Sequence, residues 1–323
     1  MSLKRDALMV SAGILTVALA LGACSPSATG AVGQPTWLTA IDALRPSTLA
    51  EGARLQVVAT TSLVADLLGN VGADGIEMTA LLPLGIDPHT YEPSPQDMRA
   101  IAEADVVFLN GLGLEETLSV TVRNAGGGAP IVSLSEGIVP LRLEGEAGGP
   151  DPHVWLDPNN IVVWAENAAA ALAALDPARA DYYRSNAEAY AAALRDLDAR
   201  IRDRVAQIPE ADRKLVTDHD ELGYFAVRYG FEIVGALIPA YSSAAEPSAQ
   251  ELSQLETTIR ELGTRAVFVG TGVNQELAAR VAEDTGVRLV PLYTHSLSGP
   301  DGPATSYRTL MEYNVNAIVE ALR

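Results

Sequence analysis

The central part of the chain, residues 176–209, carries the clearest pattern in the sequence and reads DPARADYYRSNAEAYAAALRDLDARIRDRVAQIP. Asp176 followed by Pro177 is typical of a helix start, because an aspartate side chain caps backbone N–H groups and proline fits the first helical position. Apolar residues then recur at steps of three and four: Tyr183, Ala187, Tyr190, Leu194, Leu197, Ile201, Val205 and Ile208. We therefore expect one long helix over residues 176–209, about 45–50 Å in length. A coiled-coil segment is the alternative, but the apolar pattern lasts only about four heptads and lies between two halves of the chain with an α/β pattern.

On both sides of this helix, short β-branched runs alternate with helical patterns. The candidate strands are Leu55–Thr60, Ile76–Leu82, Asp105–Asn110 and Ile131–Leu134 before it, and Lys214–Asp218, Glu232–Ile238, Ala266–Gly270 and Arg288–Tyr293 after it. Such alternation predicts parallel sheets covered by helices. The expected fold class is α/β, with two lobes that each hold a mostly parallel sheet flanked by helices. The N-terminal lobe would span 54–175 and the C-terminal lobe 210–323, joined by the long linking helix.

Length and composition limit the possible functions. The chain has 323 residues, enough for two domains of about 100–150 residues each. With 41 Asp+Glu against 22 Lys+Arg, its formal charge is −19, so we expect no nucleic-acid partner, because phosphates would be repelled. One cysteine excludes an intramolecular disulfide framework and a Cys-rich zinc site. Four histidines therefore carry most of the information about function.

The N-terminus has the features of a lipoprotein signal peptide over residues 1–24. Two basic residues precede an apolar run, Ala7–Ala20, and the segment ends in the sequence LGAC. This ending resembles the bacterial lipobox, in which the cysteine becomes the lipidated first residue of the mature chain. We therefore predict lipidation of Cys24, an extracytoplasmic protein anchored in the cell membrane, and a flexible tether over 25–53. An uncleaved membrane anchor with an incidental cysteine is the alternative.

Each of the four histidines lies in a loop after or near an apolar strand. They are His89, His153, His219 and His295, two in each half of the chain. Strand ends of open α/β sheets form the crevices in which ligands bind. The long spacings between them exclude a local finger-type site, so the histidines can meet only through the fold. We interpret them as one metal site between the lobes.

The segments around the histidines resemble a known family. They are Pro88–Pro93 (PHTYEP), His153–Pro158 (HVWLDP), Asp218–Phe225 (DHDELGYF) and Tyr293–Leu297 (YTHSL). Together they resemble the zinc- and manganese-binding lipoproteins of bacterial ABC importers, the cluster A-I solute-binding proteins, and the resemblance extends over most of the chain after the signal peptide. It implies a receptor that binds a divalent metal between two α/β lobes and delivers it to a membrane permease driven by an ATPase. We expect the receptor to be a monomer.

The resemblance also implies the ligands. His89 and His153 fall on the two ligands of the family's N-terminal lobe, and His219 falls on the third position. The fourth position is usually aspartate in the family, whereas this chain has His295. A set of imidazoles without a carboxylate favours zinc, because manganese prefers oxygen ligands. We therefore expect Zn²⁺, with Mn²⁺ as the alternative.

The departure at His295 leaves a second ligand set open. If His295 turns away, an oxygen of Asp301, Asp220 or Glu221 would complete the site. The chain also lacks the His-rich acidic loop of some zinc-specific relatives, which weighs against zinc. A ligating histidine usually donates its other N–H to a carboxylate or carbonyl group. The candidates for that supporting role, from their nearness in sequence, are Asp87, Glu92, Asp157 and Asp220.

Two other classes of function fit the sequence less well. An enzyme is not expected, because neither a His-Glu-x-x-His helix nor a Gly-x-Ser-x-Gly elbow is present. Four protein ligands would also close the coordination position that a catalytic zinc keeps open. A surface adhesion protein with a structural metal is the second alternative, and equilibrium metal binding separates it from a receptor.

Overall fold

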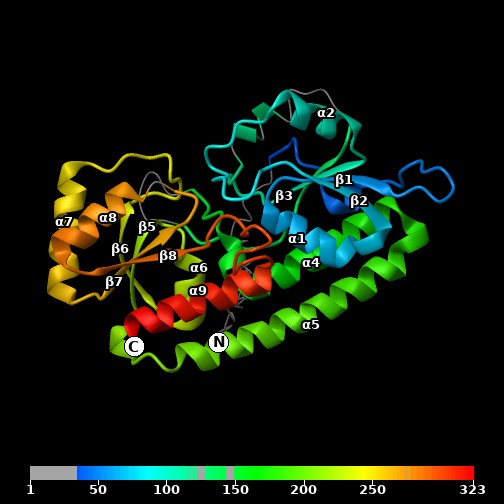
Figure 1. Ribbon diagram of the computed structural model, residues 1–323. Helices are drawn as coiled ribbons and strands as arrows, with labels where there is room; N and C mark the ends of the chain where they lie inside the picture. Colours follow the sequence, from blue (N-terminus) through cyan, green and yellow to red (C-terminus); the bar gives the residue numbers. More distant parts are fainter. Residues whose placement is uncertain (1–34, 116, 119, 122–127, 143–148, 274) are drawn as a thin grey trace, which may run out of the picture. The chain divides into compact units, whose positions relative to one another are not determined.

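The computed structural model describes residues 35–323 except for 116, 119, 122–127, 143–148 and 274 (Figure 1). The predicted signal peptide, Cys24 and the first part of the predicted tether therefore lie outside the described residues. None of the described helices combines the length and the apolar character that a membrane span requires.

The N-terminal lobe is built on a four-stranded sheet with strand order β2-β1-β3-β4, in which every pairing is parallel. Its strands are β1 (Leu55–Ala59), β2 (Ile76–Ala80), β3 (Val106–Leu109) and β4 (Ile131–Ser133). The four residues of β3 are all buried, as expected of a central parallel strand with both faces covered. The covering helices are α1 (Ser62–Gly72), α2 (Pro95–Glu103) and α4 (Pro158–Leu175).

The C-terminal lobe repeats this arrangement with the strand order β6-β5-β7-β8, again all parallel. Its strands are β5 (Lys214–His219), β6 (Glu232–Ile238), β7 (Ala266–Gly270) and β8 (Arg288–Leu292). Its helices are α6 (Gly223–Tyr229), α7 (Ala249–Leu262), α8 (Glu276–Thr285) and α9 (Tyr307–Leu322). Helix α7 begins at a capping box, in which Ser248 and Glu251 each bond the other's backbone N–H.

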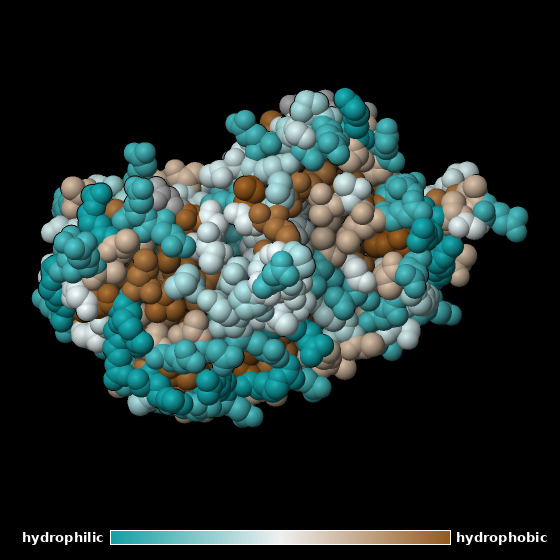
Figure 2. Space-filling model, viewed as in Figure 1, coloured by the Kyte–Doolittle hydropathy of each residue, from teal (hydrophilic) through white to brown (hydrophobic). Residues whose placement is uncertain are grey.

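One long helix, α5 (Ala180–Val205), links the lobes along the lower edge of Figure 1. It lies within the predicted range 176–209, and Pro177–Arg179 before it forms a 3-10 turn. The helix packs against α1 and α4 of the N-terminal lobe and against α9 of the C-terminal lobe. Its buried stripe includes Leu194, Leu197 and Ile201, while hydrophilic residues cover much of the corresponding edge in Figure 2. The predicted fold class is confirmed.

One hydrophobic cluster extends through both lobes. It includes Val57 and Phe108 of the N-terminal sheet, Leu194 of α5, and Phe268 and Leu292 of the C-terminal sheet. A continuous core couples the lobes mechanically, because close-packed side chains leave little room for sliding. The two sheets are therefore held in a fixed position relative to each other.

The described part of the predicted tether differs from the expectation. The backbone N–H of Thr39 donates to the carbonyl of Ile131 at 2.7 Å, and that of Ser47 donates to the carbonyl of Leu175 at 2.8 Å. Leu44 is buried in the core of the N-terminal lobe. Apolar residues in this segment gain more from packing on the lobe than from exposure to water. From Pro35 onward the segment is therefore part of the lobe.

Candidate metal centre

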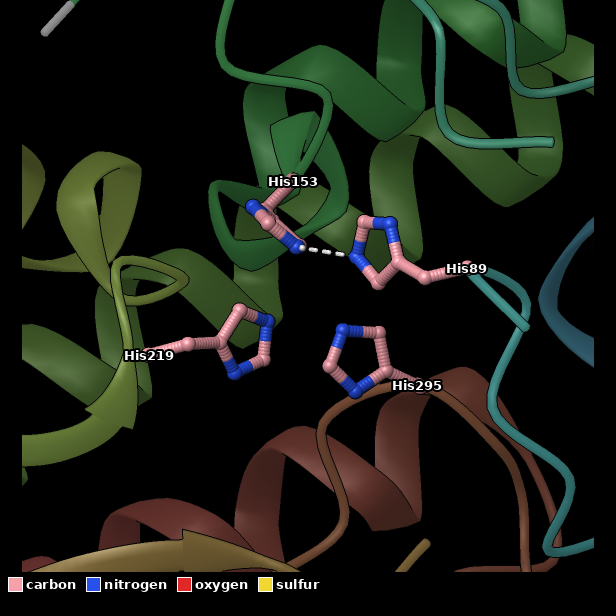
Figure 3. Close-up of side chains that lie close together, drawn as sticks. All are labelled: His89, His153, His219 and His295. Carbon is pink, nitrogen blue, oxygen red and sulfur yellow. Dashed lines mark hydrogen bonds between the residues drawn. The ribbon is translucent and has the colours of Figure 1, made fainter. Parts of the chain in front are cut away.

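The four histidines of the chain lie together between the lobes (Figure 3). His89 comes from the loop between β2 and α2, and His153 immediately precedes the 3-10 turn Val154–Leu156. His219 is the last residue of β5, and His295 follows β8. Because the parallel strands of each sheet end at the same edge, the two lobes present their loops to each other there.

The rings are close enough to share one ion. One nitrogen from each histidine lies within 4.8 Å of the corresponding nitrogens of the other three, and the six centroid distances run from 5.0 to 5.7 Å. The Nε2 atoms of His89 and His153 are 3.2 Å apart. Two nitrogens bound to one zinc at about 2.0–2.1 Å in tetrahedral geometry are separated by about 3.3 Å. Figure 3 shows the Nε2 atom of every ring facing the others.

Burial keeps three of the four rings neutral. His153 and His219 are fully buried, and His295 is 4% exposed. Burial, together with the charge of the neighbouring histidines, holds the pKa of His153 well below its usual range. Burial is also the main cause of the lowered pKa of His295, and it lowers the pKa of His89 to about 4. Neutral imidazole is the form that binds a metal, so none of these three rings needs to lose a proton at pH 7.

Carboxylates fix two of the rings from behind. The Nδ1 atom of His153 lies 2.8 Å from Oδ1 of Asp151, and that of His219 lies 3.0 Å from Oδ1 of Asp218. Each of these carboxylates also accepts the backbone N–H of the histidine it supports. When Nδ1–H donates to a carboxylate, Nε2 is left as the lone-pair nitrogen and faces the cluster.

Several buried polar atoms around the cluster have no hydrogen-bond partner among the described residues. They are Nε2 of His219, Nε2 of His295 and both side-chain oxygens of Glu221. A buried polar atom without a partner is costly, so their convergence indicates a site built for an ion. Burial raises the pKa of Asp151 to about 8 and that of Glu221 well above its usual range. A cation between the rings offsets this effect, because its charge favours the ionised carboxylates.

Contacts between the lobes enclose the cluster. The backbone N–H of Gly85 donates to Oγ of Ser296 at 2.8 Å, and the hydroxyl of Ser243 donates to Oδ2 of Asp87. The indole N–H of Trp155 donates to the carbonyl of Thr294 at 2.7 Å. These bonds join loops of both lobes around the histidines, so the structure is a closed form of the site.

The other predicted site residues have different positions. Asp87 bonds the backbone N–H of His89 at 2.9 Å rather than its ring. Asp157 caps α4 through the N–H of Asn159, since Pro158 starts that helix. The remaining candidates do not join the cluster, since Glu92 and Asp301 are exposed and Asp220 is half-buried.

Sequence reasoning missed Asp151 and Asp218 as the partners of the rings. A signal was present, because an aspartate stands one or two residues before three of the histidines: Asp87 before His89, Asp151 before His153 and Asp218 before His219. Such short spacing lets a carboxylate reach both the backbone N–H and the ring of the histidine. Asp301, Asp220 and Glu221 were the open candidates for an oxygen as the fourth ligand. Of these three, only Glu221 lies beside the rings.

Comparisons with known proteins agree with this architecture. The model of the family described as "ZnuA: Zinc-uptake complex component A periplasmic" matches residues 57–321. The manganese-binding lipoprotein MntA of Halalkalibacterium halodurans is 37% identical over 273 residues, 84% of this chain and 90% of the relative. The manganese ABC transporter substrate-binding lipoprotein PsaA of Streptococcus mitis is 33% identical over 282 residues, 84% of this chain and 91% of the relative.

A solved structure shows the same fold. The periplasmic zinc-binding protein TroA from Treponema pallidum superposes with a TM-score of 0.78 at 27% identity, covering 84% of this chain and 99% of that chain. The sequence resemblance and the two-lobed fold lead to the same group of proteins. The chain belongs to the ZnuA family of metal-binding, substrate-binding proteins of ABC importers.

Proposed function

We propose that this chain is a lipid-anchored extracytoplasmic receptor that captures one divalent transition metal between its lobes and delivers it to an ABC permease driven by an ATPase. The observation that supports it is the convergence of four inward-facing imidazole nitrogens, His89, His153, His219 and His295, in a buried cluster. The metal is the transported substrate, and the four rings are its ligands.

Capture depends on what the residues do before the ion arrives. Burial holds the rings of His89, His153 and His295 neutral, so the ion replaces its water shell with four nitrogens and displaces no proton from these three rings at pH 7. Asp151 and Asp218 orient two rings, and the charge of the bound ion favours the ionised form of these carboxylates, which raises the basicity of those ligands.

Zinc is the proposed substrate. Imidazole suits zinc, and the 3.2 Å separation between the Nε2 atoms of His89 and His153 fits its short bonds and tetrahedral preference. Manganese is the second candidate, because the relatives MntA and PsaA are named for manganese and because carboxylates surround the rings. Zinc ranks above manganese in intrinsic affinity for a nitrogen site.

The remaining parts of the proposal concern the whole chain. Residues 1–24 act as the signal peptide, Cys24 carries the lipid, and the segment after it spaces the lobes from the membrane. The N-terminal lobe extends to residue 175 and includes the packed segment from residue 35 onward, the linking helix lies within 176–209, and the C-terminal lobe extends over 210–323. The receptor works as a monomer.

Competition between metals tests the proposal. The full-length chain, purified in detergent and stripped of metal, is titrated with Zn²⁺ and with Mn²⁺ in the presence of a chelator of known affinity. We expect one ion per chain and at least about 100-fold tighter binding of Zn²⁺, in line with the order of divalent metal affinities. The variants His153→Ala and His219→Ala should each lose most of that affinity, while Glu92→Gln on the surface should keep it. If neither metal binds with a dissociation constant below about 1 μM, the receptor function is overturned.

A further inference from the structure

Glu221 is a buried carboxylate that the protein leaves unsatisfied. It lies in the turn between β5 and α6, two residues after His219, and is 1% exposed. Neither of its oxygens has a hydrogen-bond partner among the described residues. Its ion-pair contacts within the part of the chain that the structure describes are with His219 and His295, and no Lys or Arg approaches it there.

The carboxylate lies beside two rings of the metal cluster. Its Oε2 atom lies 3.8 Å from Nε2 of His219, the inward-facing nitrogen of that ring, and 3.5 Å from Nδ1 of His295. Two donor atoms that each lie about 2.0–2.2 Å from one zinc ion are themselves roughly 3–4 Å apart. Nε2 of His219 and Oε2 of Glu221 therefore have the spacing of two ligands of the same ion.

The other carboxylates at the site are occupied. Asp151 and Asp218 each bond a ring nitrogen and a backbone N–H, and Asp87 bonds the N–H of His89 and the hydroxyl of Ser243. Glu221 bonds neither a ring nitrogen nor a backbone N–H, and its polar neighbours beside the rings are Asp218 and Thr294, so it does not act as a ring-orienting group in the way that Asp151 and Asp218 do.

Glu115 provides a contrast elsewhere in the fold. It is as deeply buried as Glu221, but its carboxylate accepts hydrogen bonds from the hydroxyl of Thr60 and from the backbone N–H groups of Asn110 and Gly111. This is how the chain accommodates a buried carboxylate whose role is structural. Buried carboxylate oxygens without hydrogen-bond donors, beside an imidazole cluster, are instead typical of a metal ligand.

We propose that Glu221 supplies an oxygen as the fifth ligand of the ion held by the four histidines. This inference rests on the proposed receptor function and adds a specificity-determining residue to it. The oxygen neutralises one charge of the ion and gives the site a donor that manganese prefers, so Glu221 extends the metal range from zinc toward manganese. It makes the site N₄O rather than N₄.

Cobalt absorption tests the coordination number on the unmodified protein. Co²⁺ substitutes for zinc, and its visible d–d bands are stronger in a four-coordinate than in a five-coordinate site. The full-length wild-type chain loaded with Co²⁺ should show the weaker, five-coordinate spectrum. Glu221→Leu, which fills the same space without a donor atom, should show a stronger, four-coordinate spectrum. A four-coordinate spectrum of the wild-type protein would overturn the inference.

Metal affinities test the role in specificity. Glu221→Leu should lower Mn²⁺ affinity by at least about 100-fold and Zn²⁺ affinity by about tenfold, the scale of losses known for groups around metal sites. The matched control is Glu92→Gln, which removes a carboxylate on the exposed surface and should change both affinities by less than about threefold. An equal loss for both metals in Glu221→Leu would overturn the inference alone. Failure of the wild-type chain to bind any divalent metal would overturn the receptor function and the inference together.

Discussion

His219 illustrates how a single residue is prepared for an ion. Its backbone N–H and its ring Nδ1 both contact Oδ1 of Asp218, whose other oxygen accepts the N–H of Gly270 in the neighbouring strand. The ring therefore has one orientation, set from β5 and β7 together. This arrangement separates two tasks, because Asp218 orients the ring and Nε2 remains for the ion.

Removing the supporting charge should weaken binding without removing a ligand. We expect Asp218→Asn to lower zinc affinity by about 10–100-fold, because the amide orients the ring less strictly and no longer raises its basicity. Isothermal titration against a competing chelator measures the effect, with Glu92→Gln as the surface control. Unchanged zinc affinity in Asp218→Asn would show that the ring needs no such support.

The pH dependence of stability reports on the neutral rings. Burial lowers the pKa of His89 from 6.5 to about 4, so between these pH values the unfolded chain binds a proton at this residue that the folded chain does not. His89 therefore has no effect above pH 6.5 and destabilises the fold increasingly as the pH falls toward 4. His89→Gln removes this effect.

Urea unfolding of metal-free wild type and His89→Gln at several pH values between 7.5 and 4.5 checks this sign. We expect the free energy of unfolding of the wild type to fall relative to that of the variant as the pH is lowered. Asp151, whose pKa is raised to about 8, has the opposite dependence, but it is present in both proteins and cancels in the comparison. A difference that stays constant with pH would contradict the account.

At the scale of elements, α5 holds the lobes in position. Leu197 lies in its buried stripe with no exposed surface. We expect Leu197→Ala to lower the free energy of unfolding by about 2–5 kcal/mol, since a cavity replaces well-packed side-chain atoms. Arg195 lies on the exposed face of the same helix, and Arg195→Ala should change the free energy of unfolding by less than about 0.5 kcal/mol. Chemical denaturation measures the free energy of unfolding of both variants. An equal loss in Leu197→Ala and Arg195→Ala would contradict the assignment of the buried and exposed faces.

The strands and the long helix could be predicted from sequence because their patterns are local. β3 and β7 are short, continuous apolar runs, and the stripe of α5 repeats at helical spacing. Helix α4 could not be outlined individually, because its alanine-rich sequence has little contrast between faces. The packing of the segment around Leu44 against the N-terminal lobe depends on contacts with distant residues, which no local pattern contains.

The site could be predicted only in part, for the same reason. The four histidines were identified by their rarity and their positions after strands. The ring partners were not, because Asp87 is as near in sequence to a histidine as Asp151 is, and only the fold decides which carboxylate faces a ring. The unsatisfied oxygens of Glu221 are likewise visible only in three dimensions.

At the scale of the whole molecule, the family confirms two further predictions. The chain is a substrate-binding protein rather than an enzyme, and it works outside the cytoplasm. A receptor of this kind has to close on its substrate and then release it. The contacts that bridge the lobes near the site, such as Ser243 with Asp87 and Gly85 with Ser296, are the bonds that opening must break.

Weakening one of these bridges should speed release. A hydrogen bond to a charged group is worth about 1.5–3 kcal/mol, so Ser243→Ala should increase the rate of zinc dissociation by about tenfold or more. Stopped-flow mixing of the loaded protein with an excess of a chromophoric chelator measures this rate. Ser253→Ala, on the exposed surface of α7, is the matched control and should leave it unchanged. An equal rate in Ser243→Ala and wild type would show that the bridge does not limit opening.

The central claim is that four histidines from two lobes hold one ion. Anomalous X-ray scattering from crystals grown with zinc, recorded on both sides of the zinc absorption edge, tests it most directly. We expect one strong peak per chain, about 2.0–2.1 Å from Nε2 of His89, His153, His219 and His295 together. A peak elsewhere, or one from which any of the four rings turns away, would contradict it.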